Sequence, residues 1–191
     1  MVQEKSVKNI KMRLLITGAS GFIGKNFIEN APKDMEITAV YNNSNNIKSF
    51  VEKKRLKNVR LCRCDFTKKK ELDDLFKRIG GNFEYCIYLA GNVNVPFSIA
   101  NPAEDLNANA IALINFLQAC SKIGRFVYMS SAAVYDGNKG IVTAKTRLDP
   151  TVPYCISKLA AEQYIKFFSN FGKIGSYVII RFGGAYGKYS E

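Results

Sequence analysis

The stretch TGASGFIG at residues 17–24 constrains the fold of this 191-residue chain more than any other feature. It follows the apolar run RLLIT, which predicts a buried strand, and it opens a helical pattern over 22–30. Its three glycines serve separate purposes. Gly18 permits a tight turn, Gly21 lets a ligand approach the backbone, and Gly24 lets the helix pack close to the sheet. A strand, a turn and a helix joined in this way predict an α/β fold.

Apolar runs and helical patterns alternate along the rest of the chain. Further strands are predicted at 35–41, 59–64, 85–90, 125–131 and 176–182. Further helices are predicted over about 47–57, 68–79, 104–123 and 154–169, with Thr67 placed to cap the second of these. Short apolar strands joined by helices favour a doubly wound parallel sheet of the Rossmann type, with helices on both faces. We expect one domain over residues 1–191, preceded by a basic N-terminal tail at 1–11.

The composition removes several classes of function. The chain has no histidine, which excludes Ser-His-Asp hydrolysis and leaves proton transfer to Tyr, Lys, Asp, Glu or Cys. Its five cysteines, an odd number in mostly apolar segments, predict reduced thiols in the cytoplasm and no metal site. No run approaches the ~20 apolar residues of a membrane span, so no membrane partner is expected. The net charge of +12 favours a solvated basic face or a phosphorylated small molecule over nucleic acid.

The glycine turn predicts a phosphate site, because the free N–H groups and partial positive charge of a helix start hold phosphates. In dinucleotide-binding folds, an acidic residue at the end of the second strand usually binds the ribose. Here that strand is followed by Asn42 and no carboxylate. Asn42 can still bond a hydroxyl, whereas Lys48 and Arg55 could meet a 2′-phosphate, so both NAD and NADP stay open. Asp65, after the third strand, either touches the adenine or serves as a turn residue.

Two Tyr-x-x-x-Lys pairs compete as candidates for chemistry. Tyr135 and Lys139 are separated by the turn sequence Asp-Gly-Asn, so they need not converge. Tyr154 and Lys158 begin a predicted helix and project together, and the fifth strand ends nearby at Ser131. A tyrosine has a pKa near ~10 and a useful acid–base catalyst needs ~7, a gap of about 4 kcal/mol. An ammonium ~5 Å away at an effective dielectric of ~20 supplies roughly 3 kcal/mol of it.

Five segments, in this order, resemble the extended short-chain dehydrogenase/reductase superfamily, in its branch of NAD(P)-dependent sugar epimerases and dehydratases. They are TGASGFIG, YLAGNVNVPFSIANPAEDLNANAIALINFLQAC, FVYMSSAAVY, PYCISKLAAE and VIIRFGGAYG. The resemblance implies an NAD(P)-dependent epimerase or 4-ketoreductase that acts on a nucleotide-linked sugar by hydride transfer. Tyr154 would be the acid–base, Lys158 would lower its pKa and bind the nicotinamide ribose, and Ser131 would bind the substrate oxygen. A homodimer through helices 104–123 and 154–169 is also implied.

The same resemblance extends to the cofactor site. The candidate cofactor-binding residues are Gly18, Ser20, Gly21, Phe22, Ile23, Gly24, Asn42, Asp65, Phe66, Leu89, Ala90, Gly91, Asn109, Tyr154 and Lys158. Asn109 matches the asparagine of the superfamily's catalytic tetrad and is otherwise an ordinary helix residue. Arg181 matches an arginine of the sixth strand and has an equally good structural interpretation.

Departures from the family pattern limit the interpretation. Dehydratases carry Asp-Glu where this chain has Ala132 and Ala133, so a 4,6-dehydratase is not expected. The usual glutamate before the tyrosine loop is missing, with Ala144 and Lys145 nearby. The C-terminal lobe that grips the sugar nucleotide is expected to be missing or truncated. A non-catalytic NAD(P)-binding module, or a fragment that is the cofactor domain, therefore remains the alternative.

Overall fold

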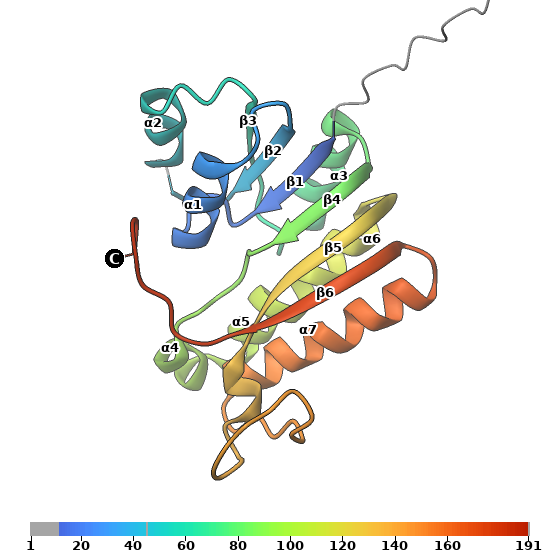
Figure 1. Ribbon diagram of the computed structural model, residues 1–191. Helices are drawn as coiled ribbons and strands as arrows, with labels where there is room; N and C mark the ends of the chain where they lie inside the picture. The colour runs from blue at the N-terminus through green and yellow to red at the C-terminus, as the bar shows by residue number, and fades with distance from the viewer. Residues whose placement is uncertain (1–11, 45, 191) are drawn as a thin grey trace, which may run out of the picture.

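A computed structural model describes residues 12–44 and 46–190, so the expected tail at 1–11 lies outside the described residues. Six strands form one parallel sheet in the order β3-β2-β1-β4-β5-β6 (Figure 1). The strands are β1 (Arg13–Thr17), β2 (Glu36–Tyr41), β3 (Val59–Arg63), β4 (Asn82–Tyr88), β5 (Lys122–Ser131) and β6 (Ile174–Phe182). This order confirms the predicted doubly wound sheet. Strands are added toward one edge from β1 to β3 and toward the other edge from β4 to β6, and such folds bind ligands where the two halves meet, between β1 and β4.

Helices join the strands. They are α1 (Phe22–Asn30), α2 (Asn46–Lys53), α3 (Lys69–Ile79), α4 (Val95–Ala100), α5 (Pro102–Leu106), α6 (Ala112–Ala119) and α7 (Pro153–Asn170). A π-helical turn, η1 (Asn107–Ile111), joins α5 to α6, and a 3-10 turn, η2 (Ala132–Tyr135), follows β5. In Figure 1, α1 and α2 lie on one side of the sheet, and α3, α6 and α7 lie on the other.

Alternation along β1 divides the core into two layers. Leu14 and Ile16 belong to a buried cluster with Ile28 of α1, whereas Leu15 belongs to a second cluster with Phe116 of α6. Each such side chain, when fully buried, contributes about 1.5–3 kcal/mol relative to exposure. The near-continuous apolar strands of the sequence are thus explained by a sheet that is covered on both faces.

Coverage of the two faces is unequal. Helices α1 and α2 lie over the β1–β3 half of their face, and no described helix lies over β5 and β6 on that side (Figure 1). Val178 and Ile180 of β6 are accordingly 47% and 38% exposed. The described part of the chain leaves an apolar strip of the sheet open there.

The observed elements differ from the expected ones at three places. The helix expected over 104–123 is divided into α5, η1 and α6 and ends at Ala119, because Cys120 turns extended and β5 begins at Lys122. Helix α4 occupies a segment expected to be loop. The predicted cap by Thr67 is wrong, because its hydroxyl donates to Asp65 Oδ1 (2.7 Å) and α3 starts one residue later without a side-chain cap.

Substitution of Gly24 tests how closely α1 packs against the glycine turn. A Cβ on Gly24 would lie 2.7 Å from the Gly18 carbonyl oxygen and 2.8 Å from the Ala19 Cα, both backbone atoms. We expect Gly24→Ala to lower the free energy of unfolding by about 1–2 kcal/mol, because this overpacking outweighs the gain of about 1 kcal/mol in helix propensity. Urea unfolding measures the change. The control is Gly184→Ala, where a Cβ meets nothing within 4 Å; equal stability of the two variants would contradict the packing argument.

Candidate functional site

The turn after β1 and the chain after β4 touch at the carboxyl edge of the sheet. Gly18 has φ +63°, and a Cβ there would lie 2.8 Å from the Leu89 carbonyl carbon, so glycine is required for both reasons. The buried Thr17 hydroxyl accepts hydrogen bonds from the N–H groups of Leu89 and Ala90, each at 3.1 Å. These contacts fix the two loops on either side of the point where the strand order reverses.

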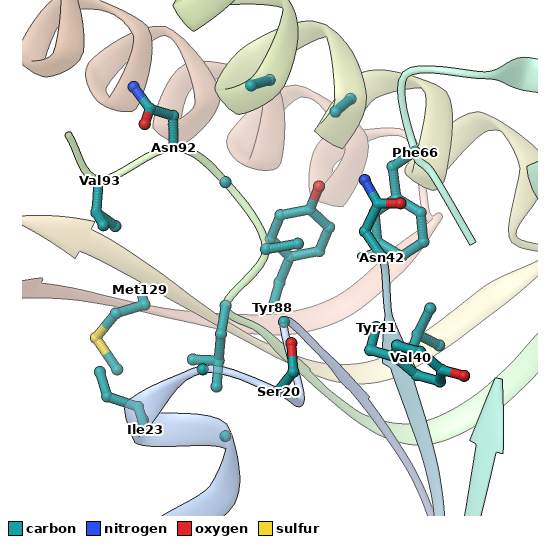
Figure 2. A pocket seen from close by; sticks show the side chains of 18 of the residues that line it. Ser20, Ile23, Val40, Tyr41, Asn42, Phe66, Tyr88, Asn92, Val93 and Met129 are labelled. Carbon is teal, nitrogen blue, oxygen red and sulfur yellow. The ribbon is translucent and has the colours of Figure 1, made fainter. Parts of the chain in front are cut away.

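A cavity of about 810 Å³ opens between these loops. Figure 2 shows Ser20 and Ile23 from the glycine turn and α1, with Asn42 and Phe66 toward one end and Val93 and Met129 toward the other. The sequence-predicted residues that line this cavity are Gly18, Ser20, Gly21, Phe22, Ile23, Gly24, Asn42, Asp65, Phe66, Leu89, Ala90, Gly91, Ser131, Tyr154 and Lys158. Asn109 does not line the cavity, and neither do Lys48 and Arg55, the candidates for a 2′-phosphate.

The start of α1 forms a wall of this cavity. Gly21 is its N-cap without a side-chain hydrogen bond, and the first turn carries no acidic residue. The first N–H groups of the helix and its partial positive charge are therefore available to an anion. The backbone of Gly18, where a Cβ would not fit, lies in the same wall. The residues present fit the phosphates of a dinucleotide.

Tyr154 and Lys158 lie in the first two turns of α7 and face β5. The Lys158 Nζ donates to the Met129 carbonyl oxygen at 2.8 Å and lies 5.0 Å from the centre of the Tyr128 ring. Ser131 ends β5 and is the N-cap of η2. Its hydroxyl accepts a hydrogen bond from the Ala133 N–H at 3.2 Å. A hydroxyl, a phenol and an amine thus meet at one end of the cavity.

Burial dominates the ionisation of the pair. It lowers the pKa of Lys158 to about 8, and the carboxylates of Asp105 and Glu162 oppose this shift. Burial also raises the pKa of Tyr154, against the hydrogen-bonding influence of Ser131. The expected lowering of the Tyr154 pKa by Lys158 is not seen in this geometry, since the amine is directed to Met129 and desolvation prevails.

Asp105 is a buried residue that the sequence analysis missed. Its side chain is 0% exposed, and its Oδ2 accepts from the Ser157 hydroxyl at 2.6 Å. Its Oδ1 accepts from Asn92 Nδ2 at 2.7 Å and from Asn109 Nδ2 at 3.0 Å. One carboxylate therefore connects α5, η1, α7 and the loop after β4. The Asp-x-x-x-Asn spacing of residues 105 and 109 on a predicted helix was the available signal.

Asn109 lies behind the cavity wall rather than in it. Its Nδ2 also donates to the Ser157 hydroxyl at 3.0 Å, and its Oδ1 has no hydrogen-bond partner among the described residues. That oxygen is aimed at Gly91, where a Cβ would collide with it. Gly91 lines the cavity and Asn109 does not, so the part of Asn109 in cofactor binding stays a prediction.

A second buried network accounts for Arg181. Glu162, one helical turn after Lys158, accepts from Ser130 Oγ (2.6 Å) and from the Arg181 guanidinium (2.8 and 3.1 Å). The guanidinium also donates to the phenol of Tyr135. Arg181 therefore has a structural role, since it joins β6 to α7 through Glu162 and to η2 through Tyr135. The competing pair does not converge on the cavity, because this contact holds Tyr135 and Lys139 is exposed.

Two further expectations concern metals and membranes. All five cysteines are buried free thiols. Within residues 12–44 and 46–190, no cluster of three or more His, Cys, Asp or Glu side chains could hold a metal ion. No helix in the same part of the chain combines the length and apolarity needed to cross a membrane.

The parallel strand order and the glycine turn at its reversal place the fold in the Rossmann class of nucleotide-binding α/β proteins. Within it, the chain belongs to the NAD dependent epimerase/dehydratase family, whose family model matches residues 14–191. The resemblance inferred from five sequence segments is thereby confirmed.

Individual relatives agree with this assignment. A putative UDP-glucose 4-epimerase of Methanocaldococcus jannaschii is 30% identical over 189 residues, covering 93% of this chain and 57% of the relative. The uncharacterized UDP-glucose epimerase YtcB of Bacillus subtilis is 33% identical over 189 residues, with coverages of 92% and 57%. The solved UDP-Glc/GlcNAc 4-epimerase of Campylobacter jejuni superposes with a TM-score of 0.78 at 25% identity, covering 89% of this chain and 53% of that structure. The chain thus spans somewhat more than half the length of these relatives.

Removal of the Ser98 hydroxyl should destabilise the start of α7. Ser98 is 0% exposed; its Oγ accepts from the Tyr154 N–H (3.2 Å) and donates to the Val95 carbonyl oxygen (2.7 Å). Val152 is the N-cap residue of α7, and its side chain makes no capping hydrogen bond. Ser98 of α4 provides that hydrogen bond instead. We expect Ser98→Ala to lower the free energy of unfolding by about 1–2 kcal/mol in urea. The exposed Ser49→Ala should change it by less than about 0.5 kcal/mol; equal effects would show that the cap is unimportant.

The buried amine of Lys158 should leave a signature in stability against pH. Its pKa is about 8 in the folded chain, whereas a solvated lysine has a pKa of 10.5, so the unfolded chain binds more protons between these values. The free energy of unfolding of the wild type, minus that of Lys158→Met, should therefore rise by about 2 kcal/mol between pH 7 and pH 10. Taking the difference removes the contribution of the buried thiols and phenols.

Chemical denaturation at a series of pH values measures this difference. Lys166→Met, at a partly exposed lysine of the same helix, tests whether removal of any α7 lysine has the same effect. A difference that is flat or falls with pH would contradict the buried, desolvated state of Lys158.

Proposed function

We propose that the protein is an NAD(P)-dependent epimerase or 4-ketoreductase that acts on a nucleotide-linked sugar. The observation that carries the proposal is the meeting of Ser131, Tyr154 and Lys158 on the same cavity as the glycine turn. The family and the names of the relatives, UDP-glucose epimerases, support the same substrate class and the nicotinamide cofactor.

The cavity divides into a cofactor end and a reacting end. The backbone at Gly18 and Gly21 and the start of α1 would hold the pyrophosphate, with Asn42 at the ribose and Asp65 beside the adenine. When bound, the nicotinamide supplies a reversible acceptor for a hydride. Lys158, which lines the other end, would bind the nicotinamide ribose.

In the proposed mechanism, Tyr154 accepts the proton of the sugar hydroxyl and returns it at the end of the cycle. The Ser131 hydroxyl orients the substrate oxygen toward the phenol. The Lys158 ammonium would favour the phenolate once it turns from the Met129 carbonyl oxygen toward the phenol; at ~5 Å and an effective dielectric of ~20 it would then contribute roughly 3 kcal/mol. With a pKa of about 8, Lys158 is mostly protonated at neutral pH.

Elimination of water is a less suitable reaction for this site. The positions after Ser131 are Ala132 and Ala133, on η2. Among the described residues that line the cavity, Asp65 is the only carboxylate, and it follows β3 at the cofactor end. The described lining therefore offers no pair of carboxyl groups for a 4,6-dehydratase.

A non-catalytic NAD(P)-binding module is the second candidate, and the raised pKa of Tyr154 favours it. A phenol with a raised pKa is a poor base at neutral pH unless Lys158 moves closer to it. The two candidates differ in one measurable respect. Both bind the cofactor, but only the enzyme interconverts UDP-glucose and UDP-galactose or reduces a 4-keto sugar nucleotide.

Substitution of Tyr154 by phenylalanine should separate chemistry from binding. Tyr154→Phe removes the proton acceptor while it keeps the aromatic ring in the cavity wall. We expect turnover to fall by about 10²–10⁴-fold, the usual contribution of a general acid–base, with cofactor affinity changed less than about threefold. Turnover of UDP-sugars and calorimetric titration of the cofactor provide the two measurements.

Tyr164→Phe, on an exposed part of the same helix, is the matched control and should keep full turnover. Unchanged turnover in Tyr154→Phe would overturn the catalytic assignment. Cofactor binding by the wild type without any turnover would favour the binding module.

A further inference from the structure

The carboxylate of Asp105 is buried among neutral hydrogen-bond donors. Its Oδ1 accepts from the side-chain amides of Asn92 (2.7 Å) and Asn109 (3.0 Å), and its Oδ2 accepts from the Ser157 hydroxyl (2.6 Å). Donors on both oxygens favour the charged form of a carboxyl group. None of the ion pairs among residues 12–44 and 46–190 involves Asp105, so no described cation is in direct contact with this charge.

Lys158 follows directly after the serine that Asp105 binds. It is 4% exposed, and its Nζ donates to the Met129 carbonyl oxygen at 2.8 Å rather than to a carboxylate. Burial lowers the pKa of Lys158, and the negative charge of Asp105 opposes that shift. The two buried charges therefore stabilise each other through space, without an ion pair between them.

The other titratable groups around the amine do not replace Asp105. Glu162, on the same helix, forms an ion pair with Arg181 at 2.8 Å, so a guanidinium balances its charge. The phenols of Tyr128 and Tyr154 also lie around Lys158, and burial raises the pKa of both, so they are uncharged at neutral pH. Asp105 is thus the described carboxylate beside Lys158 that has no cation of its own.

We propose that Asp105 is a positioning residue for the reaction, whose charge keeps the Lys158 amine protonated and so extends the pH range in which the site works. The inference rests on the proposed function, in which the ammonium favours the phenolate of Tyr154. The same carboxylate holds the amine's helix in place, since it joins the cavity wall at Asn92 to α7 at Ser157.

Asp105→Asn removes the charge and keeps the hydrogen bonds. The amide oxygen can accept from Asn92 and Asn109 as the carboxylate does. The amide N–H can donate to the Ser157 hydroxyl, which in turn can donate to the Tyr154 carbonyl oxygen, 3.0 Å away. The network stays satisfied, so the variant is expected to fold, and thermal melting by circular dichroism checks this.

NMR titration of the 191-residue chain labelled with ¹³C at the lysine Cε measures the Lys158 pKa, and Lys158→Met identifies its resonance. We expect Asp105→Asn to lower this pKa by about one unit or more. The matched control is Glu104→Gln, at the exposed neighbouring residue of α5, which should change it by less than about 0.3 units because solvent screens that charge. An unchanged pKa in folded Asp105→Asn overturns the proposal and leaves the proposed function intact.

Interconversion of UDP-glucose and UDP-galactose against pH is the second readout. A fall of the Lys158 pKa from about 8 to about 7 reduces the protonated fraction roughly fivefold at pH 8 and by only about a tenth at pH 6. The ratio of Asp105→Asn to wild-type turnover should therefore fall about fivefold over this range. Tyr154 stays protonated throughout, so it does not change the trend. A merely structural role would give a ratio independent of pH.

Asp105→Glu keeps the charge and moves the carboxylate. Its turnover relative to the wild type should be independent of pH, whatever its absolute value. A pH-dependent fall of that ratio in Asp105→Glu, or a constant ratio in Asp105→Asn, overturns the proposal. Absence of wild-type turnover at every pH overturns the proposed function and, with it, the role of Asp105 in the reaction.

Discussion

The close approach of the turn after β1 to the chain after β4 is the constraint on which the rest of the site depends. The chain leaves two neighbouring parallel strands there. The buried Thr17 hydroxyl accepts hydrogen bonds from the N–H groups of Leu89 and Ala90, which would otherwise be unpaired. Gly18 permits the approach because no Cβ fits between the two loops. The start of α1 and the loop at residues 89–91 are positioned by this contact, and they form the two walls of the cavity.

Helix α7 depends on a different kind of interaction. Three buried polar contacts hold it around the Tyr154–Lys158 pair: the Ser98 cap at its start, Asp105 on Ser157, and Glu162 on Ser130 and Arg181. Buried carboxylates are tolerated only when they are paired or hydrogen-bonded, so each of the two carboxylates restricts the geometry of the helix, and loss of its partners would leave a buried charge unpaired. The Tyr154–Lys158 pair therefore lies on the part of α7 that these contacts hold.

Much of the fold and part of the site could be predicted from local pattern. Apolar runs gave the strands, helical spacing separated Tyr154 and Lys158 from the competing pair at Tyr135, and the glycine turn marked the cavity. Thr67 was misassigned because its hydroxyl bonds Asp65 and not the helix. Asn109 was assigned to the cofactor site by resemblance; it does not line the cavity, and its part in cofactor binding stays a prediction. Spacing alone does not determine which of several possible partners a polar side chain takes.

The amino-acid sequence by itself determined the class of fold, the glycine turn and the candidate reactive pair, because these depend on periodicity and on residues close together in the chain. Only the tertiary structure decided the electrostatics. The burial that lowers the pKa of Lys158 and the carboxylate of Asp105 shared by four segments depend on residues that are distant in sequence. Their energies depend on distance and desolvation, and both quantities exist only once the strands have taken their order in the sheet.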